Sequence, residues 1–234
     1  MAGQSGKYKS FIALDIAARV ADGRGLPHYI DRDEIVMRVP TKQKVIYCLG
    51  EGSAGTPKRI RAAGLESTEM MFLTVPWPIL DDVKYTAFNK FIRSHNPDIV
   101  VLDTMQMFRT GGKTGKSNDE NSSEAIGEFY SRLSSIKNIH WLIVHHSGKG
   151  NVVARGSSAI QDDASNVWWV KGQHKATTTA TVKTVKLRDL EPMEFSVKLE
   201  MNEEVGSLYV AGYNTDPVDL AELYIDIAKE EKQQ

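Results

Sequence analysis

The chain has 234 residues, of which 41% are hydrophobic and 25% charged, and its formal net charge is −1. This size and composition are typical of one globular domain, so we expect 1–234 to form a single domain without intrachain disulfides, since Cys48 is its one cysteine. Without a membrane-length apolar run or a signal-peptide pattern we expect a cytoplasmic protein, and the near-neutral charge excludes global attraction to nucleic acid.

A candidate phosphate-binding loop opens the chain, where residues 3–10 read GQSGKYKS. Gly3 and Gly6 would let backbone N–H groups converge on phosphates, as in a Walker A loop. Lys9 would reach the outer phosphates, and the Ser10 hydroxyl would hold Mg²⁺. Apolar residues at helical spacing follow over 11–21, which predicts an amphipathic helix whose N-terminus points at the phosphates.

Two features of this loop depart from the usual pattern. Tyr8 stands where the pattern has a glycine, and only Met1 and Ala2 precede Gly3, where the pattern has a strand. By itself the motif leaves a second interpretation open, namely a Gly/Ser-rich tail leading into an ordinary core helix. Because the strand before such a loop is central to its sheet, we expect either that the natural protein starts further upstream or that the loop is distorted and binds ATP poorly.

Three apolar runs downstream predict buried parallel strands that end in polar residues. The run at 45–49 is followed by Glu51, and the run at 99–102 ends in Asp103, which is the Walker B pattern for holding the Mg²⁺ shell. The run at 141–144 leads to His145 and His146. A basic helix with Lys58, Arg59 and Arg61, a strand from Met70, and helices over 81–95 and 122–137 are predicted between and around these runs.

The remaining segments differ in texture. Residues 23–44 predict an excursion with a small hairpin, and two glycine-rich basic stretches begin at Arg109 and Ser147. A short helix is predicted over 157–164, alternating patterns over 176–211 predict antiparallel strands, and 216–231 predict a C-terminal helix. We therefore predict an α/β fold with a mostly parallel sheet flanked by helices and antiparallel strands toward the C-terminus.

The ends of these parallel strands are expected to lie along one edge of the sheet. Lys9, Ser10, Glu51, Asp103 and a histidine would then surround one Mg-nucleotide. The coincidence of these strand ends with a phosphate-loop candidate favours nucleotide binding over a tail and a core helix.

The segments GQSGKYKSFIALDIA, VIYCLGEGS, PDIVVLDT, WLIVHHSGKG and ARGSSAIQDDAS together resemble the RecA-like ATPases of the plasmid RepA helicase type, found in phages and plasmids. The resemblance runs from residue 3 to about residue 200, and members of that group often carry an aromatic residue before the Walker lysine, as Tyr8 does here. It implies a RecA-like P-loop NTPase core, rings of usually six subunits, ATP and Mg²⁺ sites between neighbours, and loops that grip single-stranded DNA.

The resemblance also implies roles for single residues. ATP would contact the whole loop, which consists of Gly3, Gln4, Ser5, Gly6, Lys7, Tyr8, Lys9 and Ser10. Glu51 would polarise the attacking water and Asp103 would hold Mg²⁺ through water. The structural alternatives are a solvated acid at a strand end and an aspartate that caps a turn.

Further roles fall on the second half of the chain. His146, or His145, would sense the γ-phosphate, and Lys186 with Arg188 would reach the neighbouring subunit's ATP as an arginine finger. A satisfied core histidine and a solvated strand face are the alternatives.

Two glycine-rich loops match the positions of the DNA-facing loops of RecA-like proteins. Their cations are Arg109, Lys113 and Lys116 in the first loop and Lys149 and Arg155 in the second. The sequence thus predicts a DNA-dependent ATPase, most specifically a hexameric helicase-like replication protein. A phage recombinase or strand-annealing protein, and a regulatory assembly protein with little hydrolysis, stay open as alternatives.

Overall fold

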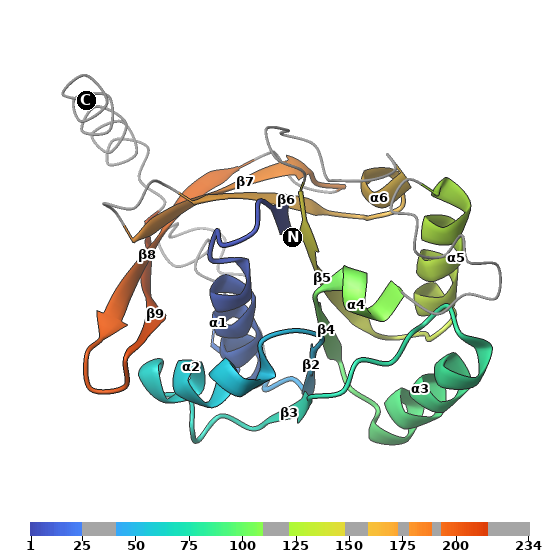
Figure 1. The fold of residues 1–234 in the computed structure, drawn as a ribbon, viewed down its shortest axis with the longest axis horizontal. Coiled ribbons are helices and arrows are strands. Elements are labelled where there is room, and N and C mark those ends of the chain that lie inside the picture. Colours follow the sequence, from blue (N-terminus) through green and yellow to red (C-terminus); the bar gives the residue numbers. More distant parts are fainter. Residues whose placement is uncertain (25–40, 110–121, 148–158, 173–177, 189–192, 215–234) are drawn as a thin grey trace.

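The computed structural model describes residues 1–24, 41–109, 122–147, 159–172, 178–188 and 193–214 (Figure 1). Nine strands form one sheet in the order β3-β2-β4-β5-β1-β6-β7-β8-β9. Within the described residues, the helices are all too short or too polar to cross a membrane.

The sheet has a parallel and an antiparallel part. Strands from β3 across to β6 pair in parallel, and strands from β6 to β9 pair antiparallel. Their bounds are β1 (Ala2–Gly3), β2 (Val45–Leu49), β3 (Met70–Leu73), β4 (Ile99–Asp103), β5 (His140–His146), β6 (Val167–Gly172), β7 (Thr179–Lys186), β8 (Glu194–Asn202) and β9 (Ser207–Asn214). The predicted α/β class, with antiparallel strands toward the C-terminus, is confirmed.

Helices cover both faces of the parallel part. They are α1 (Lys9–Ala21), the short 3-10 turn η2 (Ser53–Gly55), α2 (Thr56–Ala62), α3 (Asp82–His95), α4 (Met105–Arg109), α5 (Ser123–Ser134) and α6 (Ala159–Asp162). One face packs against α1, and the other packs against α3, α4 and α5 (Figure 1). Successive residues of β2 enter opposite cores, Tyr47 facing α1 and Cys48 facing α3, so both faces of this strand demand apolar side chains.

Most of the predicted elements are present with boundaries shifted by one to three residues. Helix α4 was not predicted, because its five residues immediately follow the β4 strand without a separating turn signal. The predicted hairpin in 23–44, most of both basic loops and the helix at 216–231 lie wholly or largely outside the described residues.

The strand before the phosphate loop is present as the two residues of β1, which lie between β5 and β6. The Met1 nitrogen donates to the Ile143 carbonyl at 2.7 Å, and the Ser147 N–H donates to the Gly3 carbonyl at 2.9 Å. Gly3 has a φ of +155°, and a Cβ added there would lie 2.3 Å from the Val170 carbonyl oxygen of β6. Only glycine therefore fits where the loop leaves the sheet.

Replacing Gly3 with alanine tests this close approach. We expect Gly3→Ala to lower the free energy of unfolding by about 2 kcal/mol or more, because the new methyl group must displace the backbone of β6. The same substitution at Gly127, where an added Cβ meets nothing within 4 Å, is the control. Gly127→Ala should stabilise α5 by about 0.5–1 kcal/mol, so equal effects of the two in urea unfolding would contradict the explanation.

A candidate nucleotide site at the carboxyl edge of the parallel strands

The register of the parallel strands brings two predicted residues to one face, and a third to the same edge. Leu49 lies opposite Asp103, and Asp103 lies opposite Val144. Because side chains alternate along a strand, His146 is on the same face as Val144 and hence as Asp103, while His145 is on the other. Glu51 follows β2 at the same edge. Asp103 and His146 therefore lie on the face that α1 covers, and Glu51 lies at the same edge.

The phosphate loop closes on its own lysine. Lys9 is 3% exposed, and its ammonium donates to the carbonyls of Gly3 at 2.8 Å and Gln4 at 2.6 Å. Burial lowers the pKa of Lys9 to about 8, and the negative charge of Asp103 partly opposes this shift. The loop thus holds a cation at the N-terminus of α1, where the helix dipole also favours an anion.

Tyr8 occupies the position at which a Walker A loop has glycine. Its φ of 61° lies in the left-handed region, a conformation that costs a non-glycine residue about 1–2 kcal/mol. Its ring meets Phe11 edge to face, with 6.5 Å between the centroids. Packing of the ring against the core of α1 and β6 partly offsets the backbone strain.

A hydroxyl and a carboxylate meet beside the lysine. The Ser10 hydroxyl donates to one Asp103 oxygen at 3.1 Å, and the Tyr47 hydroxyl donates to the other at 2.9 Å. Burial raises the pKa of Asp103, whereas the hydrogen bonds from Ser10 and Tyr47 lower it. Its two donors thus favour the ionised form of this 4% exposed carboxylate.

This donor set fits Mg²⁺ held jointly with a nucleotide. Among the described residues, no group of three or more His, Cys, Asp and Glu side chains gathers to hold a metal ion. Mg²⁺ in nucleotide sites needs fewer protein ligands, because phosphate and water oxygens complete its octahedron. Ser10 and Asp103 would supply the two protein oxygens of such a site.

Glu51 differs from Asp103 in its exposure to solvent. Its side chain is exposed and accepts a hydrogen bond from the Thr104 hydroxyl at 3.4 Å. Thr104 itself is only 3% exposed. A buried hydroxyl thus contacts one oxygen of the Glu51 carboxylate, while the side chain of Glu51 is exposed to solvent. An accessible carboxylate at this edge has room for a water molecule in front of it.

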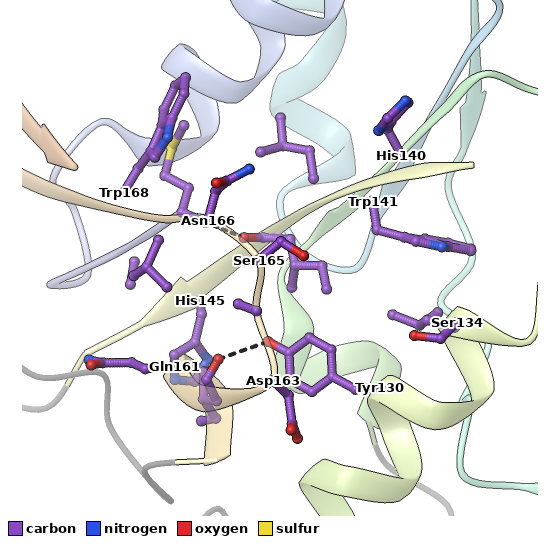
Figure 2. Close-up of a pocket in the computed structure, with 18 of the residues that line it drawn as sticks. Tyr130, Ser134, His140, Trp141, His145, Gln161, Asp163, Ser165, Asn166 and Trp168 are labelled. Atoms are coloured by element: carbon purple, nitrogen blue, oxygen red, sulfur yellow. Dashed lines mark hydrogen bonds between the residues drawn. The ribbon is translucent and has the colours of Figure 1, made fainter. Parts of the chain in front are cut away.

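The two histidines have different environments. The strand register places His146 on the same face as Asp103, and a positive charge on His146 lowers the pKa of that carboxyl group. His145 is 9% exposed and lines a cavity on the opposite face, together with Tyr130 and Gln161 (Figure 2). The geometry therefore favours His146 as the residue near the phosphates, and the expected nucleotide contact of His145 does not fit.

Sequence reasoning did not assign three residues of this site, Tyr47, Thr104 and Arg59. The charge of Arg59 lowers the pKa values of both Asp103 and Tyr47, and its guanidinium lies over the Phe11 ring at 4.8 Å. A hydroxyl in the middle of a fully buried five-residue strand is the one signal that pointed to Tyr47. Arg59 lies in α2, the helix that follows Glu51 and η2. The sequence pattern alone does not show which face of α2 carries Arg59.

The predicted finger residues lie at the opposite edge of the sheet. Lys186, at the end of β7, pairs with Val167, at the start of β6, and β6 runs parallel to β1. The Lys186 ammonium donates to the carbonyls of Gln161 at 3.0 Å and Asp162 at 2.8 Å, where α6 ends. The Arg188 side chain is exposed. Neither residue belongs to the cluster around Lys9 of the same chain.

Of the residues predicted to face DNA, only Arg109 is described. It is 3% exposed at the end of α4 and lines a small cavity with Met105, Ile126 and His145. The burial of Arg109 does not match an exposed, DNA-facing side chain in this arrangement. Lys113, Lys116, Lys149 and Arg155 lie outside the described residues.

A parallel sheet with a glycine-containing loop before α1 and an aspartate ending a neighbouring strand defines a P-loop NTPase core of the RecA-like class. A family model described as an AAA domain matches residues 1–152, and the chain belongs to this family.

Two solved structures share the fold. The ATPase domain of G40P superposes with a TM-score of 0.63 at 12% identity, covering 89% of this chain and 82% of that one. The KaiC-like protein PH0186 from the hyperthermophilic archaeon Pyrococcus horikoshii OT3 gives a TM-score of 0.56 at 13% identity, covering 89% and 86%. A comparison with curated protein sequences found no significant match.

Removing the Tyr47 hydroxyl tests its effect on Asp103. We expect Tyr47→Phe to raise the pKa of Asp103, measured by carbon NMR of the carboxyl group, because one donor to the carboxylate is lost. At neutral pH the variant should lose about 1.5–3 kcal/mol of unfolding free energy, the usual contribution of a hydrogen bond to a charged group. Tyr85→Phe, which removes a hydroxyl bonded to the Arg132 carbonyl, is the control, and it should leave Asp103 unchanged.

Proposed function

We propose that this chain binds Mg-ATP at the carboxyl edge of its parallel strands and hydrolyses it. The observation that carries the proposal is the cluster of buried Lys9 and Asp103 with the Ser10 hydroxyl at the N-terminus of α1, at the same edge of the sheet as Glu51. Buried opposite charges and a hydroxyl at a helix N-terminus suit a phosphate chain with its divalent cation better than any other common ligand.

Each residue then has one task in the reaction. The N–H groups of the loop and the Lys9 ammonium bind the β- and γ-phosphates, and the ammonium exchanges the Gly3 and Gln4 carbonyls for phosphate oxygens. Mg²⁺, when bound, neutralises charge that develops on the phosphates. Glu51 orients a water for attack on the γ-phosphorus and accepts its proton, while the bond to the ADP oxygen breaks. His146 lies on the face where the γ-phosphate would be.

The site would be completed by a neighbouring copy. Lys186 and Arg188 lie at the opposite edge of the sheet, so one chain's pair supports catalysis only at another chain's ATP. This arrangement supports a closed homo-oligomer, most specifically a hexameric ring, with ATP between subunits. Several copies would also concentrate Lys113, Lys116, Lys149 and Arg155 on one single strand of DNA, which a net charge of −1 alone does not attract.

The most specific form of the proposal is therefore a helicase-like replication protein that couples hydrolysis to movement on single-stranded DNA. A recombinase or annealing protein would share the site but form filaments or open rings. A regulatory assembly protein would bind ATP with little turnover, which the presence of Glu51 disfavours.

The first test is the steady-state ATPase rate with and without single-stranded DNA, together with the mass of the particle in solution. Lys9→Ala should abolish ATP binding, whereas Glu51→Gln should bind ATP but hydrolyse it about 100-fold more slowly or worse, since it cannot accept a proton. Lys198→Ala, which removes an exposed cation on β8, is the matched control. Equal ATPase rates in all four proteins would overturn the assignment of the ATP site. An ATPase rate that DNA does not change would overturn only the proposed action on DNA and leave ATP hydrolysis standing.

The pH dependence of ATP affinity gives a second test. Since the pKa of Lys9 without ligand is about 8, the ammonium is intact at pH 7 and is lost as the pH rises above 8. Bound phosphate favours the charged form, so the affinity should be flat below pH 8 and then fall by up to about tenfold per pH unit. Lys9→Arg keeps its charge at these pH values, and its affinity should not fall in this range. A wild-type affinity unchanged from pH 7 to 9.5 would contradict the role of Lys9.

A further inference from the structure

Lys186 and Arg188, the two residues expected to form one finger, have different environments at the end of β7. The Lys186 ammonium donates to the carbonyls of Gln161 and Asp162, the last two residues of α6. Lys186 is also half-buried, whereas Arg188, two residues further along the chain, is exposed. Of the two charged groups, the Arg188 guanidinium is therefore the one open to a second molecule.

The contacts of Lys186 are those of a helix C-cap. The last carbonyls of a helix have no partner within it, and the partial negative charge there favours a cation. Hydrogen bonds from an ammonium to such carbonyls are charge-assisted, so they are stronger than those between neutral groups. If Lys186 turned outward to a neighbouring chain, both bonds would break and the two carbonyls would lose their donor. Lys186 is therefore better placed to hold α6 than to reach a neighbour.

The connection between β7 and β8, which carries Arg188, is held on both sides. At its start, the Arg188 backbone N–H donates to the side-chain oxygen of Asn166 at 3.4 Å, in the turn between α6 and β6. At its base, the Met193 N–H donates to the Thr184 hydroxyl at 2.6 Å, and the Thr184 N–H donates to the Met193 carbonyl at 2.9 Å. Thr184 is only 1% exposed. These contacts fix the backbone on either side of an exposed guanidinium.

Helix α6 is itself anchored to α5. The Tyr130 hydroxyl of α5 donates to the Ile160 carbonyl of α6 at 3.2 Å (Figure 2). The Ile160 side chain is 6% exposed and belongs to the same core cluster as Ile126 and Phe129 of α5. The helix that Lys186 binds is thus fixed to the core of the protein.

We propose that Lys186 is a positioning residue, which holds the β7–β8 connection against α6 and leaves Arg188 as the one residue of the pair that contacts a neighbouring chain's ATP. This inference rests on the proposed function, because the phosphates belong to the ATP site of a second copy. A planar guanidinium donates to two phosphate oxygens at once, which a lysine ammonium on a flexible stem does less well. A guanidinium held in place beforehand loses little freedom on binding, so Lys186 contributes to the rate without touching ATP.

The first measurement needs no ATP. Lys186→Met keeps an unbranched side chain but removes the cap. We expect it to lower the melting temperature by about 3 °C or more and to speed amide exchange of Arg188 at least about tenfold. Lys186→Arg keeps a cation near the two carbonyls and should retain most of the wild-type stability. The control is Lys183→Met, which removes an exposed cation from the same strand and should change neither quantity.

A lysine that served only a neighbour's ATP would leave the free chain unchanged. Melting temperatures and exchange rates of Lys186→Met equal to those of the wild type would therefore overturn the positioning role.

The second measurement is the ATPase rate of the full chain, which separates one finger residue from two. Arg188→Ala should lower kcat about 100-fold or more, and Lys186→Met about tenfold, both with little change in ATP affinity. If Lys186 acts through Arg188, the double variant should be no slower than Arg188→Ala. A double variant that is a further tenfold slower would show that each residue contacts the phosphates, and would overturn the proposal.

These results separate this inference from the function on which it rests. A wild-type chain without ATPase activity would overturn the proposed function and, with it, the phosphate contact of Arg188. An active wild type whose kcat is unchanged by Lys186→Met would overturn the positioning role alone.

Discussion

The burial of two opposite charges, Lys9 and Asp103, is the constraint on which the site depends. Lys9 is 3% and Asp103 4% exposed to solvent. A buried charge costs free energy unless hydrogen bonds or an opposite charge compensate for it. Asp103 has the hydroxyls of Ser10 and Tyr47, and Lys9 has two loop carbonyls. These partners hold the two charges at the N-terminus of α1. In the proposed complex, phosphates and Mg²⁺ would take the place of these hydrogen-bond partners.

The two-sided core explains why these groups can be held so firmly. Apolar residues on both faces of β2 and β4 fix the strands that end at Glu51 and Asp103, while α1 is packed against the same strands and carries Ser10. The packed core thus holds the ends of these strands, and the site residues on them, in fixed positions. Arg59 is held by packing of its guanidinium over the Phe11 ring, and its charge lowers the pKa of Asp103.

Much of this arrangement could be predicted from patterns along the chain. Continuous apolar runs predicted the strands, and the polar residue after each run predicted the edge at which Asp103 and His146 share one face and Glu51 follows β2. The choice between His145 and His146 needed the register, because neighbours on one strand face opposite sides. Tyr47, Thr104 and the burial of Arg109 depend on contacts between distant segments, which no local pattern encodes.

Strand β1 joins the two parts of the sheet. Between the β3–β5 part of the sheet and the β6–β9 part, the backbone ladder passes through Ala2 and Gly3. Helix α1 also packs on both parts. Gly3 therefore belongs at once to the ladder that joins the two parts of the sheet and to the phosphate loop, where its carbonyl accepts a hydrogen bond from the Lys9 ammonium.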